Sequence, residues 1–440
     1  MLGIVASDAD PASSTIAEAL LAEVDWETHV DESRPSPTGG GDWYRTDGAE
    51  LRRFESMHLE LEHPEDAFST EPALLVFVSR HAGDTGPLLT GHFTGNFGPA
   101  AHGGSPNELA PAAPRALDEL LEAFDRHAPT DYAVGIECTH HGPTAVSVPS
   151  LYAEVGSDES AWQDRQATQA VARAVLELRD VEPVGDRQVV GVGGPHYAPR
   201  FERILRETAW GVGHVCPDWA LKAVRSDPSI VLEALAQSGA QHVLLDESLP
   251  EVETAVTEAG YRVVGEGWIR EVDDWPLSLI ERIEEVLGPV GSGVSLGTHS
   301  EEPFEVVSTP RALLDAAAAI DREAVLSAVA AHAVAFETRE GGTRVGDRLL
   351  VPATASSRDL VEDIAALLEP AYDTVDVTDS AVTVEHEVFD PELAATLGVP
   401  EGPAYGRLAA GESVIVDGET IDPTAVHVTD RQQFPIDDEG

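Results

Sequence analysis

Short, continuous apolar runs alternate with longer amphipathic stretches over the first two thirds of the chain. A run that is apolar throughout is typical of a strand buried on both faces, in a sheet with helices above and below it. The pattern predicts such strands at residues 2–7, 73–79, 132–138, 187–193, 242–247 and 261–266. The sequence therefore predicts an α/β fold of three layers, built on a mostly parallel sheet.

Helices are expected between these strands. Ile16, Leu20 and Leu21 recur at helical spacing, and a helix is predicted to begin at Pro199. The clearest helix covers residues 160–179, where Ser160 and Gln163 have the spacing of a capping box.

Composition divides the chain further. Residues 31–49 are rich in Pro, Gly and charge, and indicate a surface loop inserted into a first domain that spans residues 1–288. The glycine-rich residues 289–297 are interpreted as a linker. Residues 298–440 then predict a smaller accessory α+β domain, which closes with an acidic tail over residues 429–440.

The charge balance is extreme and indicates adaptation to high salt. The chain carries 79 Asp and Glu against 27 Lys and Arg, a formal charge of −52. The screening length falls from about 10 Å at 0.1 M salt to about 3 Å at 1 M, which makes so acidic a surface tolerable. The two cysteines are not in a CxxC pair, and neither a membrane span nor a signal peptide is recognisable. We therefore expect a halophilic, monomeric, cytoplasmic protein.

Four histidine-bearing segments follow or adjoin the predicted strands. They are SRHAGDTGPLLTGHFTGNFG (79–98), GIECTHHGPT (135–144), GVGGPHYAPRF (191–201) and WGVGHVCPDWALK (210–222). Polar residues at the ends of several strands of an open sheet can converge in one crevice. Adjacent side chains on a strand point to opposite sides, so His140 and His141 can share one site only if the strand has ended, as the Gly142–Pro143 turn indicates.

Histidines at converging strand ends favour a hydrolase. Imidazole transfers protons near neutral pH and is a usual zinc ligand, although no HExxH or paired CxxC fixes a metal site. No phosphate-binding GxxxxGK[ST], GxSxG elbow or GxGxxG turn after the first strand is present, which argues against ATP-driven and serine-hydrolase chemistry. From spacing alone, a zinc site and a metal-independent site stay equally open.

Four motifs together resemble the archaeal and plant type of D-aminoacyl-tRNA deacylase. They are SDADPAS (7–13), SRH with PLLTGHFTGN (79–96), ECTHHGP (137–143) and GGPHYAPRF (193–201), and the resemblance covers residues 1–288. It implies hydrolysis of the ester that joins a D-amino acid to the 3′ end of tRNA, Zn²⁺ dependence, and a fold similar to peptidyl-tRNA hydrolase and nucleoside phosphorylases.

The resemblance also suggests roles for individual residues. His140 or His141 would activate water or bind zinc, and His196 with the turn at Gly193 and Gly194 would stabilise the oxyanion. The expected catalytic residues are His140, His141, His196 and Tyr197, and the expected zinc ligands are His140, His141 and His214. The expected substrate-binding residues are Asp8, His81, Thr90, His92, Asn96, Gly193, Gly194 and Lys222.

Two other classes of function stay open at this point. One is a nucleoside phosphorylase or related hydrolase on a similar sheet, and the other is an RNA-binding module without catalysis. The acidic composition requires that any tRNA contact depends on local cations, on stacking and on 2′-hydroxyl contacts, because the electrostatic contribution is weak in molar salt.

Overall fold

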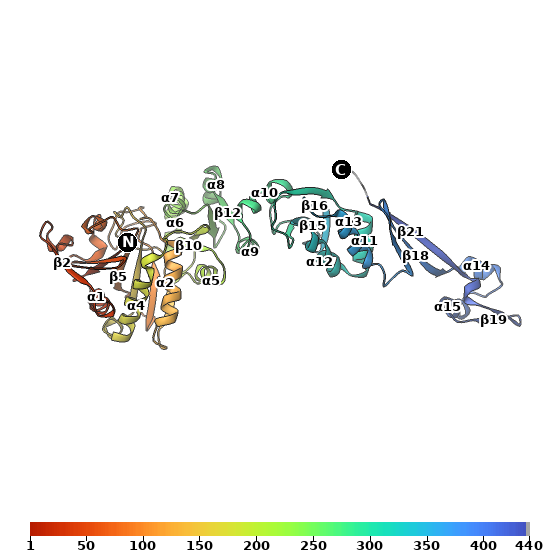
Figure 1. Cartoon of the computed structure of the whole chain (residues 1–440), viewed down its shortest axis with the longest axis horizontal. Coiled ribbons are helices and arrows are strands. Elements are labelled where there is room, and N and C mark those ends of the chain that lie inside the picture. The colour runs from red at the N-terminus through yellow and green to blue at the C-terminus, as the bar shows by residue number, and fades with distance from the viewer. Residues whose placement is uncertain (437–440) are drawn as a thin grey trace. The chain divides into compact units, whose positions relative to one another are not determined.

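The computed structural model describes residues 1–436 and separates into two compact units, Met1–Asp273 and a second unit that begins at Asp274 (Figure 1). The boundary precedes the predicted linker at 289–297. Helix α10 (Leu277–Leu287) belongs to the second unit because it packs on that unit's strands β15 and β16 (bounds below), and residues Val294–Leu296 of the expected linker form strand β13. The two units are described separately.

An eight-stranded, mostly parallel sheet with strand order β2-β3-β4-β1-β5-β8-β6-β7 forms most of the first unit. Its strands are β1 (Leu2–Ser7), β2 (Glu27–Asp31), β3 (Gly41–Thr46), β4 (Ala49–Phe54), β5 (Leu74–Arg80), β6 (Leu88–His92), β7 (Ala133–Ile136) and β8 (Ser150–Gly156). Strands β4, β1, β5 and β8 run parallel, whereas β6 pairs antiparallel with β8 and parallel with β7. The large sheet therefore reverses direction between β8 and β6.

The two faces of the large sheet are covered differently. Helices α1 (Pro11–Glu23), α4 (Arg165–Glu177) and α2 (Pro114–His127) pack side by side on one face (Figure 1). On the opposite face, Phe77 and Tyr152 of the sheet pack with apolar residues of the segments 54–68 and 110–148. This second face carries the site described below.

A separate parallel sheet with strand order β10-β9-β11-β12 completes the first unit. Its strands are β9 (Gln188–Val192), β10 (Gly211–Cys216), β11 (His242–Leu245) and β12 (Arg262–Val264). The accompanying helices are α5 (Pro199–Glu207), α6 (Leu221–Ser226), α7 (Ser229–Gln237), α8 (Pro250–Glu258) and α9 (Glu266–Glu271). The six predicted strands and the helix start at Pro199 are confirmed, but they are distributed over two sheets.

The predicted surface loop at 31–49 is present only over residues 32–40, between β2 and β3. The whole region 31–49 contains the end of β2, all of β3 and the start of β4, which form the antiparallel edge of the large sheet. Edge strands expose much of their length and tolerate polar residues, so their pattern is not distinguishable from that of a loop. The predicted helix at 160–179 is divided into α3 (Glu159–Trp162) and α4, capped by Asp158 and Asp164 rather than by Ser160.

The second unit is α+β, as predicted. Its sheets have the strand orders β13-β15-β16-β14, β17-β18-β21 and β19-β20. The strands are β13 (Val294–Leu296), β14 (Phe304–Ser308), β15 (Ala335–Arg339), β16 (Arg344–Pro352), β17 (Thr374–Val377), β18 (Ala381–Phe389), β19 (Val414–Val416), β20 (Glu419–Ile421) and β21 (His427–Pro435). The helices after α10 are α11 (Arg311–Ile320), α12 (Arg322–His332), α13 (Ser357–Ala366), α14 (Pro391–Thr396) and α15 (Pro403–Ala409).

The acidic tail predicted for residues 429–440 is corrected in its first part. Residues up to Pro435 belong to β21, which pairs with β18 along its whole length. Most of its side chains are exposed, which explains why the sequence lacks a strand pattern there. Residues 437–440 of the predicted tail lie outside the described residues. Within residues 1–436, helices that combine the length and the apolar character needed to cross a bilayer are absent.

Candidate active site

Histidines from three of the four predicted segments meet around one cavity of about 320 Å³ in the first unit. His81, His140, His141 and His196 line it, together with Asp10, His58, Glu137 and Glu154. His92 stacks on Tyr152 directly beside these side chains, with ring centroids 4.9 Å apart. The fourth segment, residues 210–222, contributes none of the cavity's lining residues.

The reversal of strand direction in the large sheet explains how these residues meet. β6 and β7 run antiparallel to β5 and β8, so the carboxyl ends of the two pairs point in opposite directions along the strands. From the sequence, all of them were expected to point the same way. Glu154 connects them from within β8. Its carboxylate lies 3.9 Å from His81 after β5 and 3.8 Å from His92 at the end of β6.

Glu137, the residue after β7, is the centre of the site. Its Oε2 accepts a hydrogen bond from His196 Nε2 at 2.6 Å, and its Oε1 lies 3.2 Å from His81 Nδ1. Burial by itself raises the pKa of Glu137, but the contacts with His196 and His81 outweigh it and hold the pKa well below its usual value. Burial lowers and the two carboxylates raise the pKa of His81, which lies above 6.5 as a result. Glu137 is therefore ionised beside a readily protonated imidazole.

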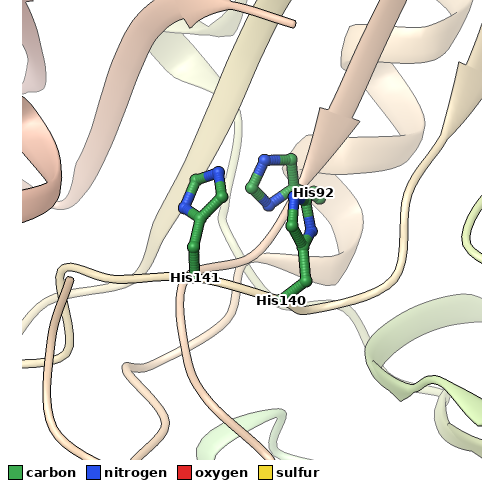
Figure 2. Close-up of side chains that lie close together, drawn as sticks. All are labelled: His92, His140 and His141. Atoms are coloured by element: carbon green, nitrogen blue, oxygen red, sulfur yellow. The ribbon is translucent and has the colours of Figure 1, made fainter. Parts of the chain in front are cut away.

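His92, His140 and His141 form a second group, the imidazole cluster. Their Nδ1 atoms bond the backbone carbonyls of Phe93 at 2.9 Å, Cys138 at 2.8 Å and Gly142 at 2.9 Å, respectively. A nitrogen that donates to a carbonyl carries the ring's proton, so the opposite Nε2 has a free lone pair. One ring nitrogen of each residue lies within 4.8 Å of those of the other two, and the rings project toward one another from β6 and from the loop after β7 (Figure 2).

The environment of the imidazole cluster suits a cation. Burial lowers the pKa of His140 to about 3 and that of His141 well below its usual value, so both rings are neutral. Burial alone would also lower the pKa of His92, but Glu154 raises it above its usual value. The buried Nε2 of His92 has no hydrogen-bond partner among the described residues. The carboxylate thus favours positive charge at a ring nitrogen that is otherwise unsatisfied.

His214, one of the three predicted zinc ligands, lies apart from the imidazole cluster. It is fully buried, with Nδ1 bonded to the Thr139 hydroxyl at 3.0 Å and Nε2 to the carbonyl of Ala110 at 2.8 Å. Both ring nitrogens are therefore occupied by structural hydrogen bonds. His92, expected to bind substrate, takes the third place beside His140 and His141.

Gly193 and Gly194 do not provide the expected oxyanion donors. Both adopt positive φ angles, near 100°, in the turn after β9, a conformation that favours glycine. Their backbone N–H groups donate to the carbonyl of Cys216 at 2.8 Å and to Asp218 Oδ1 at 2.6 Å. Because these donors are already bonded, the turn positions His196 rather than binding an oxyanion.

The other predicted substrate-binding residues differ in their placement. Asp8 pairs with Arg53 at the surface, at 2.5 Å, and the buried helix cap Asp10 lines the cavity instead. Asn96 donates to the carbonyls of Gly103 and Ser105 and so holds a loop.

Thr90 is buried opposite Glu154, and Lys222 is exposed on α6. Tyr197 reaches the site through its hydroxyl, 3.2 Å from His81 Nε2.

Glu137, Glu154, Asp10 and His58 line the cavity but are not among the predicted site residues. His58 Nε2 lies 2.9 Å from the Ser79 hydroxyl and 4.0 Å from Asp10. A signal for Glu154 is present in the sequence, because it is the single charge in the otherwise apolar strand SLYAEVG, where alternation places it on the same face as Tyr152. His58 follows a short irregular segment that carries no comparable signal.

The buried His214 predicts a pH dependence of stability. Burial lowers its pKa to about 4, against about 6.5 in the unfolded chain, so between these values only the unfolded chain binds the proton. Stability is therefore lost as the pH falls through this window, by about 3 kcal/mol at most from this residue. We expect the free energy of unfolding of His214→Gln, measured in molar KCl, to fall less steeply from pH 6.5 to 4 than that of the wild type. Parallel curves for the two proteins would contradict the assignment.

Comparison with known proteins shows which proteins the chain is similar to. A family model described as D-aminoacyl-tRNA deacylase matches residues 68–264, which include the imidazole cluster, Glu137, Glu154 and His196. A protein named D-aminoacyl-tRNA deacylase from Natronomonas pharaonis is 48% identical over 440 residues, with 99% of this chain and 100% of the relative covered. A protein of the same name from Halorubrum lacusprofundi is 48% identical over 478 residues, covering 99% and 97%.

A solved structure also matches the chain. It is a crystal structure described as a conserved protein of unknown function, with a TM-score of 0.55 and 28% sequence identity, covering 60% of this chain and 95% of that one. The two relatives match this chain over 100% and 97% of their own length. The similarity therefore extends beyond residues 1–288, the range expected from the motifs, and includes the second unit.

Proposed function

Because the chain belongs to the D-aminoacyl-tRNA deacylase family, we propose that it hydrolyses the ester bond of D-aminoacyl-tRNA and releases a free D-amino acid and tRNA. The observation that supports this activity most directly is the pair formed by buried Glu137 and the partly exposed His196, 2.6 Å apart at the cavity. Such a hydrolysis removes D-amino acids from tRNA before they enter translation.

The pair has the arrangement needed to activate water. The carboxylate of Glu137 accepts the proton-bearing Nε2 of His196, which leaves Nδ1 as the basic nitrogen of a ring held in one orientation. The His196 side chain is 29% exposed, and its Nδ1 lies 3.7 Å from the Sγ of the buried Cys138, so in this proposal the attacking water replaces that thiol contact. In this proposal His196 takes a proton from the attacking water, and Glu137 stabilises the imidazolium that results.

His81 and Tyr197 are suited to the departing ribose oxygen. The raised pKa of His81 favours its protonated form near neutral pH, and the Tyr197 hydroxyl lies 3.2 Å from its Nε2. This pair can donate a proton to the 3′ oxygen as the ester breaks. One water supplies a hydroxyl to the amino acid, and its proton remains on His196 until it passes to solvent. His81 takes up a proton from solvent in exchange, so the net reaction delivers one proton to the tRNA.

Zinc is part of the proposal, with His92, His140 and His141 as its ligands. These residues fit the metal because their ring nitrogens converge, their Nδ1 atoms are oriented by backbone carbonyls, and the Nε2 of His92 is buried without a partner in residues 1–436. When bound, zinc would supply Lewis-acid polarisation of the ester and lower the pKa of a nearby water. Glu154 would balance its charge.

The activity is tested with matched D- and L-tyrosyl-tRNA in molar KCl, by following ester loss. We expect rapid loss of the D-ester only, and we expect chelation to abolish it and added zinc to restore it. Equal hydrolysis of both esters would contradict the proposed selectivity. Full activity after removal of all metal, verified by elemental analysis, would contradict the role of zinc.

The proposal includes three further expectations. The enzyme works as a monomer, it acts in the cytoplasm where aminoacyl-tRNA is used, and its first unit has a fold similar to peptidyl-tRNA hydrolase and nucleoside phosphorylases. The mixed α/β architecture supports the third expectation, and the family supports the second.

A further inference from the structure

A second cavity, of about 540 Å³, adjoins the first one in the same unit. The two share His102, His140 and His196 as lining residues, so a molecule in one reaches the reactive imidazoles of the other. The linings differ in character. The first cavity is bordered by charged and titratable groups, whereas Phe97, Pro99, Pro217 and Trp219 give the second a largely apolar wall.

Trp219 is the most distinctive residue of the second cavity. It lies in the short turn Asp218–Ala220 after β10, and 60% of it is exposed, an unusual exposure for so large an apolar side chain. Its ring stacks on that of His196, with centroids 5.7 Å apart and planes 24° from parallel. The wall of the second cavity thus presents a flat aromatic surface in contact with the proposed base.

The cations in this part of the first unit differ in whether they are paired with a carboxylate. Arg200, Arg203 and Arg206 of α5 form ion pairs with carboxylates and are not available to a polyanion without breaking them. Lys222, the single lysine of the chain, lies three residues after Trp219 and is exposed. Within residues 1–436 its ammonium group takes part in none of the ion pairs.

On the basis of the proposed function, we propose that the second cavity binds the terminal adenine of the tRNA, stacked against Trp219. Lys222 contacts a phosphate of the same unpaired 3′ end. Every tRNA ends in the same planar base, whereas D-amino acid side chains vary in shape, so a fixed aromatic platform suits the base. The aminoacyl group then lies in the first cavity, and the ester is placed at the shared His140 and His196.

This division of the substrate also fits the salt in which the protein works. Stacking does not depend on unscreened charge, whereas phosphate contacts weaken steeply as salt rises. An acidic protein in molar salt therefore gains more from one exposed indole than from several cations. The 3′ end of tRNA is single-stranded, so its base is free to stack.

The inference is tested by the kinetics of Trp219→Ala on D-tyrosyl-tRNA and D-alanyl-tRNA. We expect KM to rise about 10-fold with both substrates, and Trp219→Phe to restore most of the loss, because a ring is retained. The matched control is Trp43→Ala, which removes an indole that likewise stacks on a histidine, His29, but at the opposite edge of the large sheet. Its KM is expected to stay at the wild-type value.

Binding of the unacylated trinucleotide CCA provides a readout that does not depend on hydrolysis. Calorimetry in molar KCl should show about 10-fold weaker binding to Trp219→Ala than to the wild type. Lys222→Gln should weaken binding mainly at lower salt and flatten its salt dependence. The control is Arg225→Gln, which removes a cation of the same helix, α6, that is paired with Glu247. It should leave the salt dependence of CCA binding unchanged.

The outcomes separate the two proposals. A loss with Trp219→Ala that is large for D-tyrosyl-tRNA and absent for D-alanyl-tRNA would place the amino acid side chain in the second cavity and overturn the inference. Equal CCA binding by wild type and Trp219→Ala would overturn it as well. A wild-type protein that binds CCA through Trp219 but leaves D-tyrosyl-tRNA intact would contradict the proposed function alone.

Discussion

Replacing Glu137 with glutamine is expected to lower kcat for D-tyrosyl-tRNA about 10³-fold, with a much smaller change in KM. The reason is the 2.6 Å hydrogen bond between its Oε2 and His196 Nε2. A carboxylate only accepts hydrogen bonds and so keeps the proton of His196 on Nε2, whereas an amide can donate and favours the tautomer that carries it on Nδ1. The variant would therefore lose the basic nitrogen while keeping the shape of the site. Multiple-turnover measurements of ester loss at saturating substrate give kcat, and single-turnover measurements show whether the loss lies in the chemical step.

Glu50→Gln is the matched control for this experiment. Glu50 is also a fully buried glutamate of the first unit, bonded to Arg52 at 2.8 Å and to Ser69, but it lies in β4, away from the site. Loss of its charge should lower the melting temperature and leave kcat within about twofold, because distant sites act independently. Comparable losses of kcat in both variants would show that Glu137 acts through stability and would contradict its role with His196.

His92→Ala and His141→Ala are each expected to lose bound zinc and at least about 10²-fold in kcat. Each change removes one of the three ring nitrogens that lie within 4.8 Å of one another. His140→Ala should behave in the same way, whereas His196→Ala should lose activity but retain the metal. Elemental analysis of the purified variants, together with single-turnover kinetics, measures both effects.

His214→Gln distinguishes this ligand set from the one expected from the sequence. Because both nitrogens of His214 have structural hydrogen-bond partners, this variant should bind as much zinc as the wild type while being less stable. Wild-type zinc content in His92→Ala would contradict the imidazole cluster. It would direct attention to the neighbouring group of His81, Glu137 and Glu154, whose ligand atoms also lie within 4.8 Å of one another.

The sequence allowed prediction of the strands that are apolar on both faces, such as β1, β5 and β9, because only a fully buried strand has that pattern. It failed for β6, β8 and β10, whose sequences LLTGH, SLYAEVG and GVGHVC contain polar or charged residues and are not among the predicted strands. All three are buried strands in which polar atoms find partners only after folding, as His214 of β10 shows. The relative directions of the strands could not be predicted either, because the local pattern of apolar residues does not determine which neighbour a strand pairs with.

The site was predictable in its histidines but not in its carboxylates. His81, His140, His141 and His196 stand in glycine-rich segments that mark them as functional candidates. Glu154 lies in a different segment of the sequence from all of these histidines. It comes close to His81 and His92 only because β8 pairs with β5 and β6, which places Glu154 opposite Ser79 and Thr90. Gly193 and Gly194 were misassigned for a related reason, since the partners of their N–H groups lie in and after β10.

The short segment from Glu137 to Thr139 joins the two sheets of the first unit. Glu137 N–H donates to Gly91 of the large sheet, and the next two N–H groups donate to His196 and to Val215 beside or within the small one. During synthesis, a chain that has left the ribosome only as far as β8 already contains the imidazole cluster and His81. It lacks His196, the second partner of Glu137, and the carbonyls of His196 and Val215 that accept from the backbone after Glu137. We therefore expect the proposed hydrolytic activity only after β10 has emerged and the small sheet has formed.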